Sequence, residues 1–474
     1  MTALFRHQFC IFRSDDQLAL PPHFVVSSLA GYQIATCPRL PVSRLVTRDG
    51  VNAGFVLGWA VKGTMLLKSK EVLNIDSTTN WRQLENELYN LAGRWLAFVT
   101  LGKSQRVYLD PLASHSTVYS QELRRVASTP YLLGAKLNPL LSELELIEQD
   151  HWYPAGLTAY KGVSRVLANH CIDLANFCHL RHWPRLDSDI VVEDTWRSQI
   201  QQIRVLIQQQ LVAYSANMPL RIGLTAGLES RAMLACSRGV TPVPLCWTRC
   251  DKSSASYQDV KTATFLATSF SLQHIVLPFK KEFQCTNSDI AQFLINTGYC
   301  VGGSPLRSHK LIDSAGECFA LTGIGGEIAR AYYESSSVAG NLSGTSLLAQ
   351  TGLPRLEPFS QATDDYLQNM PKLEQQQQLA LFYLENRVTA FGAVHRYAYQ
   401  SGLVLLSPFS HRTIVSCMLK LPVSAQLDAQ FHKALIEASW PELLLIPFNT
   451  PLNIQDKLYI FYQKVKKHIT YSLG

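Results

Sequence analysis

Two turns of small residues, each carrying one glutamate, are the parts of this sequence whose residue types point most directly to chemistry. The first turn, Thr225 to Ser230 (TAGLES), follows the short apolar run Arg221 to Leu224. A helical pattern then starts at Ala232 and would end at Gly239. The free N–H groups at a helix N-terminus, with the positive end of its dipole, attract an anion. The turn therefore predicts a phosphate site, although an ordinary strand-to-helix connection would use similar residues.

The second turn, Leu321 to Glu327 (LTGIGGE), also follows an apolar run. Its carboxylate, Glu327, and Glu229 of the first turn could together hold magnesium, which prefers oxygen ligands and shares them with phosphate. Metal and backbone N–H groups would stabilise charge on a pyrophosphate leaving group. This is the chemistry that splits ATP into AMP and pyrophosphate.

A parallel sheet would bring the two turns together. Strand and helix patterns alternate after residue 219, and the carboxyl ends of parallel strands meet at one edge, where ligands bind. The predicted strands are Arg221–Leu224, Pro242–Thr248, Gln273–Leu277 and Cys318–Thr322, and the predicted helices between them are Tyr257–Phe270 and Asp289–Thr297. A helical pattern from Glu193 precedes the first turn, and the helices Gln375–Gln400, Arg412–Leu419 and Gln430–Ser439 follow the second.

Residues 1–182 read instead as strands and turns, which predicts a layered, sheet-rich domain. The predicted strands are Phe55–Trp59, Trp95–Thr100, Arg106–Asp110 and Thr117–Ser120, with a hairpin over Gly162–Leu174 and a helix over Pro139–Ile147. The polar, proline-containing stretch His182–Asp189 is the expected linker. We therefore predict two domains, 1–182 and 190–474.

Composition bounds the class of protein. The chain has 474 residues, 47% apolar and 17% charged, which is typical of a soluble globular protein. A net charge of +7 without a block of like charges predicts no nucleic-acid partner. No apolar run reaches membrane-spanning length, and the start of the chain lacks a signal-peptide pattern. The basic, amphipathic tail from Asp456 predicts a helix that either docks on the domain or contacts a membrane surface.

Eleven scattered cysteines are typical of reduced thiols, so we expect a cytoplasmic protein. One group, His170-Cys171 with Cys178-His179, has donors that could bind zinc. It reads as two strands around a turn, and neighbours on a strand point to opposite faces, so four ligands would converge poorly.

Several motifs resemble the asparagine synthetase family. TAGLES is similar to that family's pyrophosphate loop SGGLDS, LTGIGGE to its LSGxGxDE loop, and Ser256–Asp259 (SYQD) to its segment near the nucleotide. SGLVLLSPFSHR, from Ser401, resembles the later segment that ends in PFLD. LAGRWLAFV, RVYLDPLASHSTVYS and ELELIEQDHWYPAG resemble the glutaminase-type domain that precedes the synthetase domain. The forms TAGLESR, GGEIARAYY and WPELLLIPFN look most like members from bacterial polysaccharide and natural-product clusters.

The resemblance implies an α+β Ntn-hydrolase-like sandwich followed by an α/β ATP-pyrophosphatase domain of the adenine nucleotide α-hydrolase type with a helical C-terminal part. It also implies an ATP- and magnesium-dependent, AMP-forming ligase that joins a small-molecule or glycan carboxylate to an amine or ammonia. Arg231 and Arg330 follow the two turns closely and could clamp phosphate, or could form surface ion pairs. The predicted ATP-binding residues are Leu224, Thr225, Ala226, Gly227, Leu228, Ser230, Thr248, Gly323, Gly325 and Arg330, and the predicted catalytic residues are Glu229, Glu327 and Arg231.

The sequence also departs from the family pattern. Thr2 stands where the family glutaminases carry a nucleophilic cysteine, and the first cysteine is Cys10, so we predict no glutamine hydrolysis. Ile328 replaces a second acidic residue, and Leu445–Asn449 lacks the lysine that serves acyl transfer in the family.

These departures leave an alternative, a catalytically impaired nucleotide-binding or scaffold protein of the same fold. A third reading, thiolation of a nucleotide base, would use Cys246 and Cys250. A homodimer is left open.

Overall fold

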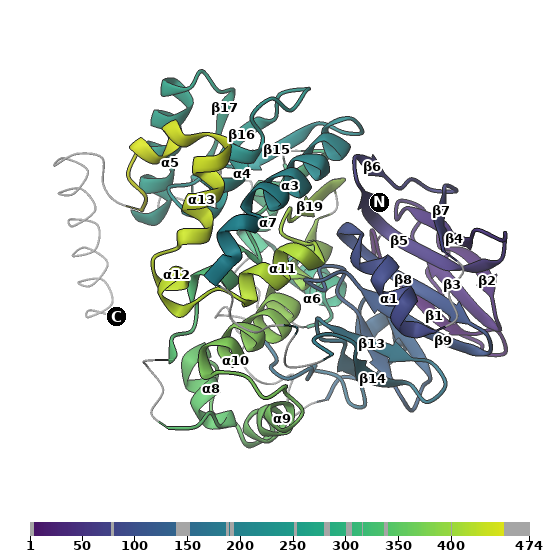
Figure 1. Cartoon of the computed structure of the whole chain (residues 1–474). Helices are drawn as coiled ribbons and strands as arrows, with labels where there is room; N and C mark the ends of the chain where they lie inside the picture. The colour runs from purple at the N-terminus through teal and green to yellow at the C-terminus, as the bar shows by residue number, and fades with distance from the viewer. Residues whose placement is uncertain are drawn as a thin grey trace.

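The computed structural model describes residues 4–76, 80–138, 152–185, 189, 194–250, 254–278, 285–299, 306–314, 316–335, 340–399 and 401–449. The chain forms a mixed α/β fold with two antiparallel-rich sheets, one parallel sheet and a helical C-terminal part (Figure 1). The helix predicted over Pro139–Ile147, the basic C-terminal helix and Thr2 lie outside the described residues.

The N-terminal half consists of two sheets that share one apolar core. Residues of both sheets, such as Ile11 and Phe98, belong to the same buried cluster. Strand β1 lies inside the six-stranded sheet, in the order β12-β10-β11-β1-β3-β2. The strands of this sheet are β1 (Phe9–Arg13), β2 (Val25–Leu29), β3 (Tyr32–Thr36), β10 (Val118–Ser120), β11 (Arg125–Ala127) and β12 (Ser164–Arg165).

The second sheet has the order β14-β13-β9-β8-β5-β4-β7, with β6 paired to β5. Helix α1 (Trp81–Tyr89) packs Leu84 and Leu88 onto its other face, against Trp95 and Tyr108. The strands are β4 (Val42–Thr47), β5 (Asn52–Lys62), β6 (Met65–Leu66), β7 (Val72–Ile75), β8 (Ala92–Leu101), β9 (Ser104–Leu109), β13 (His170–Asp173) and β14 (Cys178–Arg181). A short 3₁₀ helix, η1 (Pro130–Leu133), follows β11.

The predicted hairpin over Gly162–Leu174 is wrong. Strand β12 pairs with β10 in the first sheet, whereas β13 pairs with β9 and β14 in the second. The chain therefore crosses between sheets at Ala168-Asn169, where a pattern of alternating residues cannot distinguish a turn within one sheet from a crossover to another. The strands predicted over Phe55–Trp59 and Trp95–Thr100 are confirmed, as parts of β5 and β8.

The C-terminal half is built on a five-stranded, all-parallel sheet in the order β17-β16-β15-β18-β19. Each strand predicted from the sequence is present, and β19 adds an edge strand. The strands are β15 (Leu220–Gly223), β16 (Leu245–Cys250), β17 (His274–Pro278), β18 (Cys318–Leu321) and β19 (Leu403–Leu406). Alternate residues of β18 enter different clusters: Phe319 joins the main core, and Ala320 packs with Tyr399 and Ile312. Both faces of the sheet are therefore covered, as the alternation predicts.

Helices surround this sheet. Those between or before its strands are η3 (Asp194–Gln199), α3 (Ile200–Ser215), α4 (Leu228–Cys236), α5 (Ser254–Ser269), α6 (Asn287–Thr297), α7 (Leu306–Asp313) and η5 (Gly326–Arg330). Those of the helical part are α8 (Gly344–Thr351), α9 (Glu357–Gln368), α10 (Gln375–Phe382), the π-helix η7 (Tyr383–Gly392), η8 (Val394–Ala398), α11 (Arg412–Leu419), α12 (Val423–Leu427), α13 (Gln430–Ser439) and η9 (Pro441–Leu445). Among the described residues, none of these helices combines the length and apolar character needed to cross a membrane.

The two halves contact each other through buried polar groups. Arg181 of β14 forms a bidentate ion pair with Glu385 of η7, with N–O distances of 2.5 and 2.8 Å. The Oγ of Ser410 donates to Asp110 Oδ1 at 2.8 Å, so the segments RVYLDPLASHSTVYS and SGLVLLSPFSHR meet in space. The apolar core also continues from one half into the other.

Candidate functional site

The two glutamate turns lie side by side where the order of the parallel strands reverses. From β15 the chain proceeds outward to β16 and β17, and then returns to β18 on the other side of β15. The loops after β15 and β18 therefore flank a topological switch point, the place where open parallel sheets bind ligands. The prediction that a parallel sheet would unite the two turns is confirmed.

The first loop is held by its own side chains. The N–H of Thr225 donates to Ser230 Oγ at 3.2 Å, and the N–H of Gly227 donates to Thr225 Oγ1 at 3.1 Å. The N–H of Ala226 donates to Asp259 Oδ1, on α5, at 2.9 Å. Helix α4 begins at Leu228, inside the predicted turn and before the predicted helix start at Ala232, and no side chain caps its N-terminus. The donors left for an anion are thus those of the first turn of α4 rather than those of Thr225 to Gly227.

The second loop lies directly on Glu229. A Cβ added to Gly323 would stand 2.6 Å from Cβ of Glu229, and one on Gly326 would stand 2.9 Å from its Cγ. Only glycine permits this close approach. Gly325, at φ +95°, would place a Cβ 2.7 Å from Leu112 of the N-terminal half. The glycines therefore set the spacing between the two loops and between the second loop and the N-terminal half.

The two carboxylates influence each other. Burial, and after it the negative charge of Glu229, raises the pKa of Glu327 above its ordinary value. Oε2 of Glu327 accepts the N–H of Gly325 at 2.9 Å. Arg330 forms an ion pair with Glu229.

The two glutamates fit a magnesium ion that shares its ligands with phosphate. In the part of the chain that the structure describes, no three His, Cys, Asp or Glu side chains converge as a metal cluster. Magnesium needs only one or two carboxylates when phosphate oxygens supply further ligands. Glu327, with its raised pKa next to a like charge, is the group that a cation would stabilise most.

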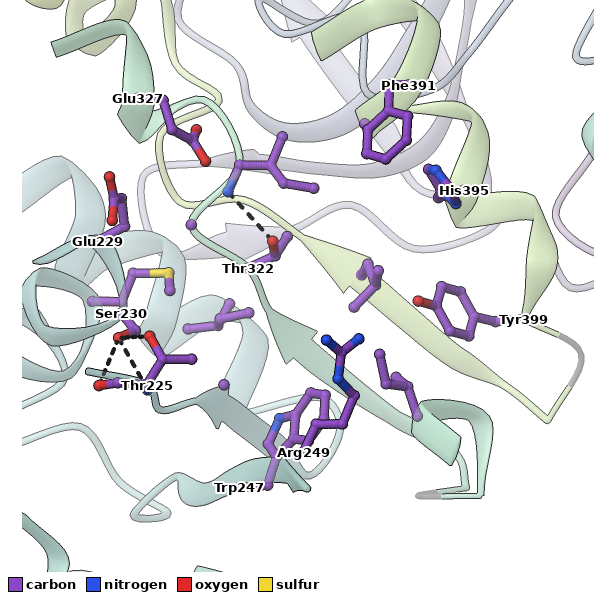
Figure 2. A pocket seen from close by; sticks show the side chains of 18 residues that line it. Thr225, Glu229, Ser230, Trp247, Arg249, Thr322, Glu327, Phe391, His395 and Tyr399 are labelled. Carbon is purple, nitrogen blue, oxygen red and sulfur yellow. Dashed lines mark hydrogen bonds between the residues drawn. The ribbon is translucent and has the colours of Figure 1, made fainter. Parts of the chain in front are cut away.

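A cavity of about 570 Å³ opens beside these carboxylates. Figure 2 shows Glu229 and Glu327 on one side of it and Phe391, His395 and Tyr399 on the other. A smaller cavity of about 220 Å³ adjoins it over β16 and is lined by Leu224, Thr248, Ser256 and Asp259 among others. Both cavities lie over the carboxyl ends of the strands.

Most of the sequence-predicted residues are brought together here. Thr225, Glu229, Ser230, Gly323 and Glu327 line the larger cavity. Leu224 and Thr248 line the smaller one, where Thr248 Oγ1 donates to the carbonyl of Leu224 at 2.7 Å. Four further predicted residues belong to the loops or to the start of α4 but do not line either cavity: Ala226, Gly227, Leu228 and Gly325. Arg330 forms an ion pair with Glu229.

Arg231 lies elsewhere. Its side chain is fully buried, away from the lining of both cavities. It donates to the carbonyls of Leu443, Ile446 and Pro447, and it stacks over Phe448 at 4.0 Å. The sequence suggested a phosphate clamp because Arg231 follows the turn closely, but its position in α4 turns it toward the segment after η9.

That segment approaches the first loop from the other side. The N–H of Asn449 donates to the carbonyl of Ala226 at 3.0 Å. The stretch Leu445–Asn449 therefore lies next to the predicted pyrophosphate loop, but without a lysine. Lys433, the described lysine that could substitute, is exposed on α13 and does not line the cavity, and Lys457 lies outside the described residues.

Sequence reasoning missed Phe391, His395 and Tyr399, which line the larger cavity, whereas His432 lies outside its lining. His432 is buried behind Gly326, and burial lowers its pKa to about 4. The sequence contains only a weak indication of these residues, which is that aromatic and histidine residues occur within the predicted helix Gln375–Gln400. The structure divides this predicted helix into α, π and 3₁₀ segments.

The remaining residues that the sequence singled out do not line either of the two cavities. Burial raises the pKa of the Cys10 thiol, inside β1, to about 12, so this thiol stays protonated. His170 and His179 lie on one face of the β13–β14 hairpin with ring centroids 5.5 Å apart, whereas Cys171 packs into the second core. This agrees with the prediction that the four donors converge poorly. Ile328 is likewise buried in the main core.

Comparison with models of known protein families finds no match, and comparison with curated proteins finds none either.

Proposed function

We propose that this chain is an ATP-dependent, AMP-forming ligase of the asparagine synthetase type, which adenylates a carboxylate and passes the acyl group to an amine or ammonia. In this proposal residues 1–182 form an Ntn-hydrolase-like domain and residues 190–474 an ATP-pyrophosphatase domain. The observation that carries the proposal is the meeting of Glu229 and Glu327 at the switch point, beside the uncapped N-terminus of α4 and a large cavity.

Each part of this site would have its own task. The N–H groups of the first turn of α4 would bind the β- and γ-phosphates and stabilise the pyrophosphate that leaves. Glu229 and Glu327 would hold magnesium, which supplies neutralising charge to the phosphates. Thr248 and the walls of the smaller cavity would hold the nucleoside, and the larger cavity would hold the carboxylate and exclude water.

The chemistry then needs two displacements. An oxygen of the substrate carboxylate attacks the α-phosphorus of ATP, the new O–P bond forms, and the bond to pyrophosphate breaks. The amine then attacks the acyl carbon, gives up a proton and displaces AMP. The nitrogen comes from ammonia or a free amine, because the protonated, buried Cys10 supports no glutaminase chemistry. The N-terminal half would serve structure or substrate recognition.

The first test is calorimetric binding of ATP to the full chain, with and without magnesium. We expect magnesium-dependent binding, weakened about 100-fold by Glu229→Gln and by Glu327→Gln, which corresponds to about 2.7 kcal/mol. The matched control is Glu357→Gln, at an exposed glutamate on α9. Unchanged affinity in both site variants would remove these residues from the proposal, and no binding at millimolar ATP would overturn it.

A second candidate, a nucleotide-binding or scaffold protein without turnover, has two observations in its favour. Arg330 already neutralises Glu229, and three N–H groups of the first loop are satisfied by protein acceptors. Such a protein would bind the nucleotide but never form AMP with any carboxylate. Sustained AMP formation would exclude it.

A further inference from the structure

The two adjoining cavities form two chambers that meet over the first loop. Gly223, Thr225, Trp247, Arg249 and Ile312 line both of them. The chamber over β16, with Thr248, Ser256 and Asp259, offers polar side chains. The larger chamber, which we call the β19 chamber, extends over β18 and β19 to the helices η7 and η8.

The far wall of the β19 chamber, with Phe391, Tyr399 and Leu405, is largely apolar and aromatic. Ile312, Leu321 and Ile324 add further side chains without a hydrogen-bonding group to the lining of the chamber. Figure 2 shows Phe391 and Tyr399 on the side of the chamber opposite Glu229. A ligand placed there would contact carbon over most of its surface, which favours an apolar ligand.

The polar groups of that wall carry no charge at neutral pH. Burial lowers the pKa of His395 to about 3, so its imidazole is neutral. Burial also raises the pKa of Tyr399, so its phenol keeps its proton. Among the described residues that line the β19 chamber, the charged side chains are Glu229 and Glu327 at the loop end and Arg249 on the wall shared with the other chamber.

We propose, on the basis of the adenylating function above, that the carboxylate substrate is an apolar acid with an aromatic ring or a hydrocarbon body. The ring or chain lies against Phe391, Tyr399 and Leu405, and the carboxylate points toward the first loop. One of its oxygens attacks the α-phosphorus of ATP, and the pyrophosphate leaves with the electron pair of the broken P–O bond. An acid with a second charge at the far end of its body would bury that charge beside neutral groups and bind poorly.

The same wall disfavours sugar acids. Every hydroxyl that enters the chamber must replace its hydrogen bonds to water, and an unpaired buried hydroxyl is costly. Beyond Glu229, Glu327 and the wall shared with the other chamber, the described lining side chains toward η7 and η8 that carry hydrogen-bonding groups are Thr322, His395 and Tyr399. The chamber thus accepts one or two polar substituents but not a ring that carries many.

The experiment compares acids that have the same net charge but differ in polarity. AMP release is measured with saturating ATP and magnesium for phenylacetate, 4-hydroxyphenylacetate and hexanoate, and for aspartate and glucuronate. In parallel, binding of each acid is measured by saturation-transfer NMR in the presence of ATP. We expect kcat/KM and binding to favour the first three acids by at least about 100-fold, since a single methylene in a hydrophobic pocket already contributes about 10- to 200-fold.

Two variants test whether the preference for apolar acids arises in the β19 chamber. Phe391→Ala should lower kcat/KM for phenylacetate by about 10- to 100-fold. The matched control is Phe265→Ala, at a phenylalanine on α5 that is 49% exposed, which should change it less than about twofold. Circular dichroism and melting temperature show whether each variant is folded. Leu405→Trp, which fills the chamber, gives a second variant should Phe391→Ala unfold.

The outcomes separate this proposal from the function on which it rests. If ATP binds with magnesium but aspartate or glucuronate is preferred, or if no acid binds, the apolar class is overturned and the nucleotide site stands. If phenylacetate is preferred but Phe391→Ala and Leu405→Trp both leave it unchanged, the chamber is the wrong site. If ATP itself does not bind, both proposals fall.

Discussion

Two carboxylates in this protein, the buried Glu385 and the half-buried Glu327, lie in opposite electrostatic settings. Burial alone would raise the pKa of Glu385, but the charge of Arg181, with hydrogen bonds from Arg181 and Asn169, holds it below its ordinary value. Glu327 has a raised pKa because burial and the neighbouring Glu229 both oppose its charge. The charge of Glu385 is compensated by partners within the fold, which is typical of a structural ion pair. Glu327 lies beside a like charge, which is the electrostatic setting expected of a group that binds a cation.

The largest expected effect comes from breaking the compensated site. Glu385→Gln leaves Arg181 buried without its counter-charge, so we expect the free energy of unfolding to fall by about 3–5 kcal/mol. Chemical denaturation followed by fluorescence measures it. The control Glu357→Gln, on the surface, should stay within about 0.5 kcal/mol. A loss below about 1 kcal/mol for Glu385→Gln would show that this ion pair does not hold the halves together.

An intermediate case is Arg231, a buried cation whose partners are carbonyl groups. Arg231→Met should lower the free energy of unfolding by about 2 kcal/mol, because hydrogen bonds to a charged group are lost. Affinity for ATP with magnesium should change less than about threefold, since the side chain lies away from both cavities. A tenfold loss of affinity with little change in stability would restore Arg231 to the phosphate site.

The smallest effect, and one of opposite sign, is expected at the uncompensated site. The folded state holds the proton of Glu327 more tightly than the unfolded chain does, whose pKa is 4.5. Stability from this group therefore falls as pH rises from about 4.5 through the raised pKa. Glu327→Gln removes that loss, so without nucleotide we expect its melting temperature at neutral pH to exceed that of the unchanged protein by about 1–2 °C.

The difference in melting temperature between Glu327→Gln and the unchanged protein should vanish below about pH 4, where Glu327 is protonated in both the folded and the unfolded state. Scanning calorimetry across this pH range measures it. A Glu327→Gln variant that melts lower than the unchanged protein at neutral pH would mean that the carboxylate already has a cationic partner in the fold.

The sequence predicted best where periodicity is strong and local. Helices α11 and α13 have the bounds that their patterns predict, and the strands that carry both turns are present. It failed where partners come from distant segments. Nothing near Glu385 in the sequence reveals Arg181, which is 204 positions away.

The same limit applies to the site. The turns containing Glu229 and Glu327 could be found because strand, turn and helix follow one another locally. Phe391 and Tyr399 could not, because a π-helix and a 3₁₀ helix shift their direction relative to a regular α-helical wheel. Arg231 was misassigned for a related reason, since closeness in sequence to a turn does not fix which way a helical side chain points.

The π-helix η7 limits whether one half of this protein could be replaced by the corresponding half of another protein. It presents Glu385, Asn386 and Thr389 to the N-terminal half, and it presents Phe391 and Gly392 to the cavity. Separating the two halves at the predicted linker would leave Glu385 without its counter-charge, on the segment that also lines the β19 chamber. A foreign N-terminal half would therefore have to supply equivalents of Arg181 and Asn169 before η7 could keep this arrangement.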